Sequence, residues 1–214
     1  MKTEELNGTA GQLTWKISNN TLIISGNGEM LYYCYSKYCN VAAINTVIIE
    51  TGVTNIREWA FGEFTSLTSI IVPNSVKSIG ESAFYSCENL TSIIIPNSVI
   101  SIGKKAFLNC TSLTSITIPK IVITIESWAF GCCHNLTSIT NLSSVPIGIS
   151  PDVFPTVRKG KLFIPIISYN SGEQIFNTKE VECTLKVPKA SISAYKNAEV
   201  WKEFNIVGIE EGNK

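Results

Sequence analysis

Apolar residues recur along this chain at a fixed spacing of 23 positions, and the spacing holds without a slip through the middle of the sequence. Three apolar columns define the repeat: Ile56, Ile79, Ile102 and Ile125; Phe61, Phe84, Phe107 and Phe130, each preceded by alanine; and Leu67, Leu90, Leu113 and Leu136. One repeat of this length cannot bury its apolar face alone, whereas stacked repeats bury a continuous core. The pattern therefore predicts a β-rich solenoid.

Within one repeat, the alternation of residues predicts a short strand. In "LTSIIIP" we expect Leu90, Ile93 and Ile95 to point into the core. Ser92 and Ile94 should point outward, because side chains alternate along a strand. The proline that follows cannot donate to a ladder, so the strand ends there. A second extended piece, "SVISI", and the turn "GKKAFLNC" complete the coil, and neighbouring coils should stack about 4.8 Å apart.

The repeat weakens toward both ends of the chain. A degenerate coil begins near Ile44, and the register breaks after Leu136. It resumes at Leu162 in "LFIP" and again 23 residues later at Leu185 in "LKVP". We therefore expect diverged coils in this part of the chain.

Both ends carry patterns expected of caps, which a solenoid needs to cover its terminal coils. "LTWKISNNTLIIS" alternates on either side of Asn19-Asn20 and predicts a hairpin. "SISAYKNAEVWKEF" predicts a helix with Ser191 at its N-cap. We expect one structural domain with four parts: an N-terminal cap over 1–43, regular repeats over 44–141, diverged repeats over 142–188 and a C-terminal helical cap over 189–214.

Composition narrows the classes of function. Lys plus Arg and Asp plus Glu number 17 each, so the chain has no basic field for nucleic acid or an anionic membrane. The apolar runs are too short for a transmembrane helix, so we expect no membrane insertion. The start, "MKTEELNGTAGQ", lacks the apolar core of a signal peptide. Either the protein is intracellular or a targeting segment lies outside this sequence.

Residues suited to catalysis are sparse. "GCCHN" contains Cys132, Cys133 and His134, which suggest a nucleophile or a metal ligand. Cys133, however, falls in a core column of the repeat, and His134 is the only histidine, so no histidine pair can bind a metal. We expect no catalytic residue, no metal and no cofactor.

The seven cysteines leave at least one thiol free or paired between chains. Cys87, Cys110 and Cys133 share one column, and aligned side chains run parallel to each other, so we expect buried free thiols. Cys34 and Cys39, in the N-terminal cap, are better candidates for a disulfide. A bridge between them and two free thiols both remain open.

The outward positions of the strands form the candidate binding surface. Its two rows are Ser69, Ser92, Ser115 and Ser138, and Ile71, Ile94, Thr117 and Thr140. These side chains are small and uncharged, with isoleucines at one end. The surface therefore suits a flat protein partner or weak self-association and does not suit nucleic acid. The alternative is that serine and threonine only keep the sheet soluble and β-prone.

A second candidate surface is the tyrosine-rich "LYYCYSKYCN" of the N-terminal cap. Its aromatic residues are Tyr32, Tyr33, Tyr35 and Tyr38. They could stack on a glycan, and the alternative is that they pack over the first coil.

The repeat "LTSIxIPxSVxSIGxxAFxxC", read from Leu90 to Cys110, resembles the BspA-like, Treponema-type leucine-rich repeat. "LTWKISNNTLIISGNGEM" and "CTLKVPKASISAYKNAEVWKEFNIVG" resemble the N- and C-terminal caps of Bacteroides-type members. The resemblance covers almost the whole chain. In the fourth copy Glu126 replaces the glycine found at Gly80 and Gly103, which should change the turn locally.

The resemblance implies a right-handed leucine-rich-repeat solenoid with a sheet on one face and few helices. It also implies a secreted or surface-displayed protein, which favours a targeting segment outside this sequence, and it offers no catalytic residues to carry over. We therefore expect a non-enzymatic, adhesin-like module that binds a host matrix or bacterial surface protein through the sheet. The alternative is a glycan-binding accessory protein that uses the tyrosine cluster.

Overall fold

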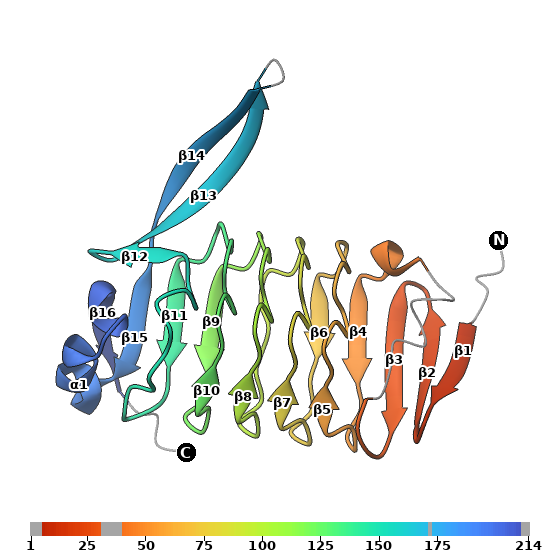
Figure 1. The fold of residues 1–214 in the computed structure, drawn as a ribbon. Helices are drawn as coiled ribbons and strands as arrows, with labels where there is room; N and C mark the ends of the chain where they lie inside the picture. Colours follow the sequence, from red (N-terminus) through yellow and green to blue (C-terminus); the bar gives the residue numbers. More distant parts are fainter. Residues whose placement is uncertain (1–5, 31–39, 171–172, 211–214) are drawn as a thin grey trace.

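The computed structural model describes residues 6–30, 40–170 and 173–210. The chain winds into a β-solenoid whose coils stack in sequence order, with one hairpin projecting from the stack (Figure 1). The first and last strands of the chain, β1 (Leu6–Ala10) and β16 (Asn205–Ile209), lie at opposite ends of the solenoid. The predicted fold class, a solenoid with few helices, is confirmed.

The N-terminal cap is an antiparallel meander of three strands: β1 (Leu6–Ala10), β2 (Leu13–Ser18) and β3 (Thr21–Gly26). The predicted hairpin is confirmed as β2–β3. Asn19 and Asn20 both have positive φ, 49° and 60°, which a two-residue hairpin turn of type I′ requires and which asparagine tolerates well. Strand β1 extends the cap by one strand that the sequence did not predict.

Two faces of the solenoid carry parallel strands. The larger face consists of β3, β4 (Thr46–Ile49) and β6 (Ser69–Ile71), and then, farther along the stack, β9 (Ser115–Ile118), β11 (Ser138–Asn141), β15 (Thr184–Pro188) and β16 (Asn205–Ile209). The second sheet consists of β5 (Asn55–Ile56), β7 (Ser78–Ile79), β8 (Ser101–Ile102) and β10 (Thr124–Ile125). The segment 91–96 joins neither ladder of the larger face, which is therefore divided between β6 and β9.

A ladder of phenylalanine rings fills the core. The rings of Phe61, Phe84, Phe107, Phe130 and Phe154 stack with centroids 5.1 to 5.5 Å apart. All five side chains are buried, so each coil covers the ring of the one before it. The ladder ends against two aromatic rings of the C-terminal cap.

The cysteine column lies beside this ladder as free, buried thiols, as predicted. Cys110 Sγ donates to the carbonyl oxygen of Phe84 at 3.1 Å, and Cys133 Sγ donates to that of Phe107 at 3.3 Å. Burial raises the pKa of both thiols well above the ordinary value. These cysteines therefore link adjacent coils by hydrogen bonds, without covalent bonds.

The turns between the two faces require unusual backbone conformations at two fixed positions of each coil. The residues with positive φ are Trp59, Ser82, Lys105 and Trp128 at the first position, and Glu63, Ser86, Asn109 and Cys132 at the second. Backbone hydrogen bonds between coils hold these turns: the N–H of Phe61 donates to the oxygen of Ala83, and that of Phe84 to Ala106, each at 2.8 Å. These hydrogen bonds between coils offset the conformational free energy that the residues with positive φ cost.

Gly80 and Gly103 occupy the same position of successive coils, where the backbone of the preceding coil lies too close for a side chain. A Cβ atom on Gly103 would lie 2.8 Å from the carbonyl carbon of Gly80. Glu126 occupies the same column in the fourth copy, and its carboxylate accepts a hydrogen bond from the N–H of Lys104 at 3.1 Å. The turn keeps its backbone hydrogen bond, because the N–H of Ala129 donates to the oxygen of Glu126 at 3.2 Å.

The expectation that the repeat register resumes at Leu162 is wrong. Leu162 lies in an antiparallel unit made of β12 (Thr156–Arg158), β13 (Lys161–Asn170) and β14 (Glu173–Glu182). The coil strand after β11 is β15, in which Leu185 lies beside Ile139. The apolar alternation of "LFIP" suits an antiparallel hairpin as well as a coil strand, because both have a period of two. The predicted division of the chain at residues 44, 142 and 189 stays a prediction.

The C-terminal cap contains a shorter helix than the sequence predicted. It contains η2 (Lys189–Ser191), α1 (Ile192–Asn197) and η3 (Trp201–Glu203), followed by β16, which the sequence did not predict. Ser191 takes the N-cap position of α1, but its side chain makes no capping hydrogen bond. The buried Tyr195 and Trp201 donate to carbonyl oxygens of Ser143 and Ile147, so the cap is fastened to the last coil turn.

Candidate protein-binding face

The predicted outward rows lie on the solvent side of the larger sheet face. Ile71 and Ile94 are 56% and 84% exposed, whereas Ile93 and Ile95 beside the latter are buried. Of the other predicted positions, four are exposed and two are half-buried: Ser69, Ser92, Ser115 and Thr117, and then Ser138 and Thr140. The alternation read from the sequence therefore places all eight side chains on one side of the sheet.

Strand register extends the isoleucine row toward the N-terminal cap. Ile23 lies beside Ile48 on the neighbouring strand, and Ile48 beside Ile71. Ile94 follows at the equivalent position one repeat later. We call these four residues the isoleucine stripe. Sequence reasoning missed Ile23 and Ile48, although the alternation in "TLIIS" and "TVIIE" marks them as outward positions.

A row of hydroxyl side chains runs beside the isoleucine stripe. Thr21 lies beside Thr46, and Thr46 beside Ser69. Farther along the stack the isoleucine row becomes polar, because Thr117 lies beside Thr140 and Thr140 beside Lys186. The face thus has an apolar half and a polar half.

The break in the sheet coincides with the most exposed isoleucine. The segment 91–96 joins neither ladder, yet its inward residues pack in the core like those of other coils. Ile94 therefore stands on a segment without strand pairing on this face, although its coil pairs with both neighbours on the second sheet. Full burial of such a side chain against a partner is favourable by about 1.5 to 3 kcal/mol.

A shallow depression of about 1080 Å³ lies at the ends of the strands beside the stripe. Its lining residues are Ile49, Glu50, Thr51, Ile71, Val72, Pro73, Asn74, Ser75, Ile94 and Pro96. Three isoleucines, one valine and two prolines make much of this lining apolar, and Glu50 is its only charged residue. The depression is an open extension of the stripe.

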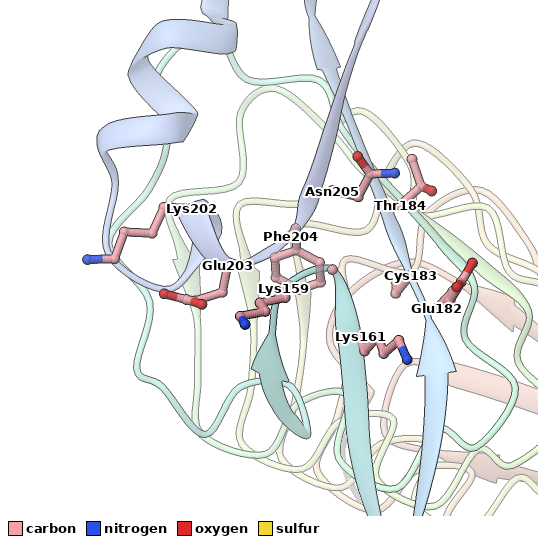
Figure 2. Close-up of a pocket in the computed structure, with 10 residues that line it drawn as sticks. Lys159, Lys161, Glu182, Cys183, Thr184, Lys202, Glu203, Phe204 and Asn205 are labelled. Atoms are coloured by element: carbon pink, nitrogen blue, oxygen red, sulfur yellow. The ribbon is translucent and has the colours of Figure 1, made fainter.

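A second cavity, of about 500 Å³, lies between the base of the projecting hairpin and the C-terminal cap (Figure 2). Lys159, Lys161 and Lys202 contribute positive charge, but Lys161 Nζ forms an ion pair with Glu180 at 2.9 Å. Burial raises the pKa of Cys183 in this cavity to about 12. The thiol is therefore protonated near neutral pH and is no nucleophile.

Burial disfavours the thiolate form of the two cysteines in the "GCCHN" turn. Burial raises the pKa of Cys132, and burial together with the nearby ammonium of Lys179 lowers the pKa of His134. Cys133 is enclosed in the core. Among the residues that the structure describes, no cluster of three or more His, Cys, Asp or Glu could hold a metal ion.

Two earlier candidates lie outside the described residues. They are the tyrosine cluster, Tyr32, Tyr33, Tyr35 and Tyr38, and the candidate disulfide between Cys34 and Cys39. In the described part of the chain no helix is both long and apolar enough to span a membrane.

Comparison with known proteins identifies the repeat. Residues 31–156 match the model of the BspA type leucine rich repeat region in six copies. No curated protein matches significantly.

Three solved structures share the fold. A T. pallidum leucine rich repeat protein is 24% identical, with a TM-score of 0.50, and the match covers 62% of this chain and 70% of that one. The pneumococcal vaccine antigen PcpA is 21% identical with a TM-score of 0.60, over 86% of this chain and 39% of PcpA. A Bacteroides ovatus leucine-rich repeat protein is 22% identical with a TM-score of 0.50, over 85% of this chain and 47% of that one. This chain belongs to the BspA-type leucine-rich repeat family.

Proposed function

We propose that this chain is a non-enzymatic interaction module that binds a protein partner through the isoleucine stripe and the adjacent hydroxyl row. The observation that carries the proposal is the exposure of Ile71 and Ile94, which lie one repeat apart and line the same depression. Contiguous exposed apolar side chains rimmed by polar ones are typical of protein interaction sites. Leucine-rich repeat proteins typically bind proteins and generally act as scaffolds without catalytic activity.

The chemistry of the face favours a protein over other partners. Interfaces combine an apolar centre, depleted of charge, with a polar rim. The stripe and the hydroxyl row carry no charge from β3 to β11, and Lys186 stands at the polar end. Such a surface offers nothing to the phosphates of a nucleic acid.

Family membership supports display outside the cell. The solenoid of this chain is similar to that of PcpA, a pneumococcal vaccine antigen. We propose a secreted or surface-displayed, adhesin-like protein whose partner is a host matrix protein or a bacterial surface protein.

A binding screen tests this function. The purified chain would be applied to arrays of extracellular-matrix proteins, mucins and glycans, beside an Ile71→Glu/Ile94→Glu variant. Ile123→Glu is the matched control, because Ile123 is 65% exposed but adjoins β10 in the second sheet. Protein binding that is lost only in the double variant supports the proposal. Binding that is lost only in the control variant places the site on the second sheet.

The same screen separates the glycan alternative. Glycan binding that survives in the Ile71→Glu/Ile94→Glu variant and disappears with Tyr35→Ala would assign the function to the tyrosine cluster. No described residue favours that outcome over the protein-binding proposal.

A further inference from the structure

The strands β13 and β14 form an arm that projects beyond the coil stack (Figure 1). Each strand has ten residues, and β12 pairs with β13 only from Lys161 to Phe163. Above that point the arm is a ribbon of two strands. A two-stranded ribbon is marginally stable in water by itself, so the arm is well suited to gain a further strand.

A proline establishes which backbone groups of the arm point outward. Pro165 lies opposite Thr178. Because proline has no N–H, this pair must be a non-hydrogen-bonded pair of the antiparallel ladder, and such pairs alternate with hydrogen-bonded ones. In β14 the backbone N–H and C=O of Gln174, Phe176 and Thr178 therefore point away from β13.

The pairing of β12 agrees with this assignment. Phe163 lies opposite Thr156, and Lys161 opposite Arg158. Both residues of β13 are an even number of positions from Pro165, so their backbone groups point toward β12, as that pairing needs.

The two outer edges of the arm differ. The edge of β13 is covered by β12 at its base and lacks a donor at Pro165. The edge of β14 has no partner strand among the described strands, contains no proline and is uncharged from Gln174 to Thr178. Natural proteins protect exposed edges with charge, proline or cover, and this part of β14 has none of them.

We propose that the outer edge of β14 pairs with β14 of a second copy of the chain, antiparallel about a two-fold axis at Phe176. The outward N–H and C=O groups of the two copies then form the hydrogen-bonded pairs of an antiparallel ladder, with Gln174 opposite Thr178 of the other copy. In this register Glu173 lies opposite Lys179, and symmetry makes the contact twice. An axis at Ile175 or at Asn177 would instead place Glu173 opposite an uncharged residue.

Contacts with the solenoid fix the position of the Lys179 ammonium. Its ammonium donates to the carbonyl oxygen of His134 at 2.9 Å and to Asn135 Oδ1 at 3.2 Å. An ammonium has three N–H donors, so one remains for a carboxylate of the second copy. The base of the arm is thereby fastened to the solenoid while its edge stays open.

Sedimentation velocity over a range of chain concentrations tests the dimer. We expect Lys179→Glu to weaken the dimer about tenfold, because two attractive pairs become repulsive. The Glu173→Lys/Lys179→Glu double variant should restore dimerisation, although it also lacks the contact of Lys179 with the solenoid. A chain that stays monomeric at every concentration, or a double variant no better than the single one, overturns the proposal.

Cross-linking tests the register. Phe176→Cys should form a disulfide-linked dimer, because the two residues 176 face each other with Cα atoms about 5.5 Å apart, within disulfide range. Thr178→Cys is the control, because the two residues 178 lie about 14 Å apart in this register. A mixture of Thr178→Cys and Gln174→Cys chains should cross-link. Equal cross-linking of the Phe176→Cys and Thr178→Cys variants contradicts the register. The dimer uses no residue of the isoleucine stripe, so either proposal can fail alone.

Discussion

Replacement of Phe107 with alanine removes a middle ring of the buried phenylalanine ladder. The ring stacks on Phe84 at 5.1 Å and on Phe130 at 5.4 Å, and the side chain is fully buried. Replacement of a buried phenylalanine with alanine lowers the free energy of unfolding by about 3 to 5 kcal/mol, and this figure includes the cost of the cavity. The coils on either side cannot close the gap, because their backbones are spaced by hydrogen bonds. We therefore expect a loss near 4 kcal/mol in the free energy of unfolding.

Urea unfolding followed by far-UV circular dichroism measures this loss. Phe107→Leu is the matched variant: it keeps most of the apolar volume and loses the two ring contacts, each worth roughly 0.5 to 1.5 kcal/mol. Its cost should be between about 1 and 3 kcal/mol. If Phe107→Ala costs less than about 1 kcal/mol, the ladder does not hold the coils together and the reasoning is refuted.

Three further predictions concern the turns and the cap. Gly103→Ala should destabilise the protein by roughly 1 to 3 kcal/mol in thermal unfolding, because its Cβ would meet backbone at 2.8 Å, whereas Gly148→Ala, with open space around it, should be neutral. His134 has a pKa below its ordinary value near 6.5, so the unfolded chain binds the proton more readily and stability falls as pH drops below about 6.5. His134→Gln should lessen that fall in unfolding curves recorded from pH 7.5 to 5, and an unchanged slope would contradict the assignment. Tyr195→Phe should cost about 1 kcal/mol in urea unfolding through the lost hydrogen bond to a carbonyl of the last coil turn, and no loss would show that the bond is not stabilising.

The middle coils were predictable because each residue type recurs at one position of a fixed period. The columns of Ile56, Phe61 and Leu67 all point into the core, as the period requires. The arm was not predictable in the same way, since Leu162 to Pro165 alternates like a coil strand and only pairing with β14 distinguishes the two. Strand β16 escaped prediction because the helical pattern read from the sequence runs to Phe204, whereas α1 ends at Asn197 and Val200 has a φ of 67°.

The sequence predicted which side chains of the candidate face point outward, but it did not predict how exposed each of them is. Alternation identifies Ile94 and Thr140 equally as outward positions, yet the first is highly exposed and the second half-buried. The difference depends on neighbours. Thr140 lies in a continuous ladder between β9 and β15, whereas Ile94 lies in the gap between β6 and β9. Nothing in the letters of "TSIIIP" indicates that this segment stays unpaired while "TSITIP" in the next coil joins a ladder.

The affinity of the chain for a protein partner found in the screen, measured by isothermal titration calorimetry with the wild type, Ile94→Glu and Ile123→Glu, tests the central claim most directly. If the isoleucine stripe is the binding surface, Ile94→Glu should weaken binding by about thirtyfold or more, as loss of a central contact does, with the melting temperature unchanged. Ile123→Glu should bind like the wild type. Equal affinity of the wild type and the Ile94→Glu variant would contradict the claim that this face binds the partner.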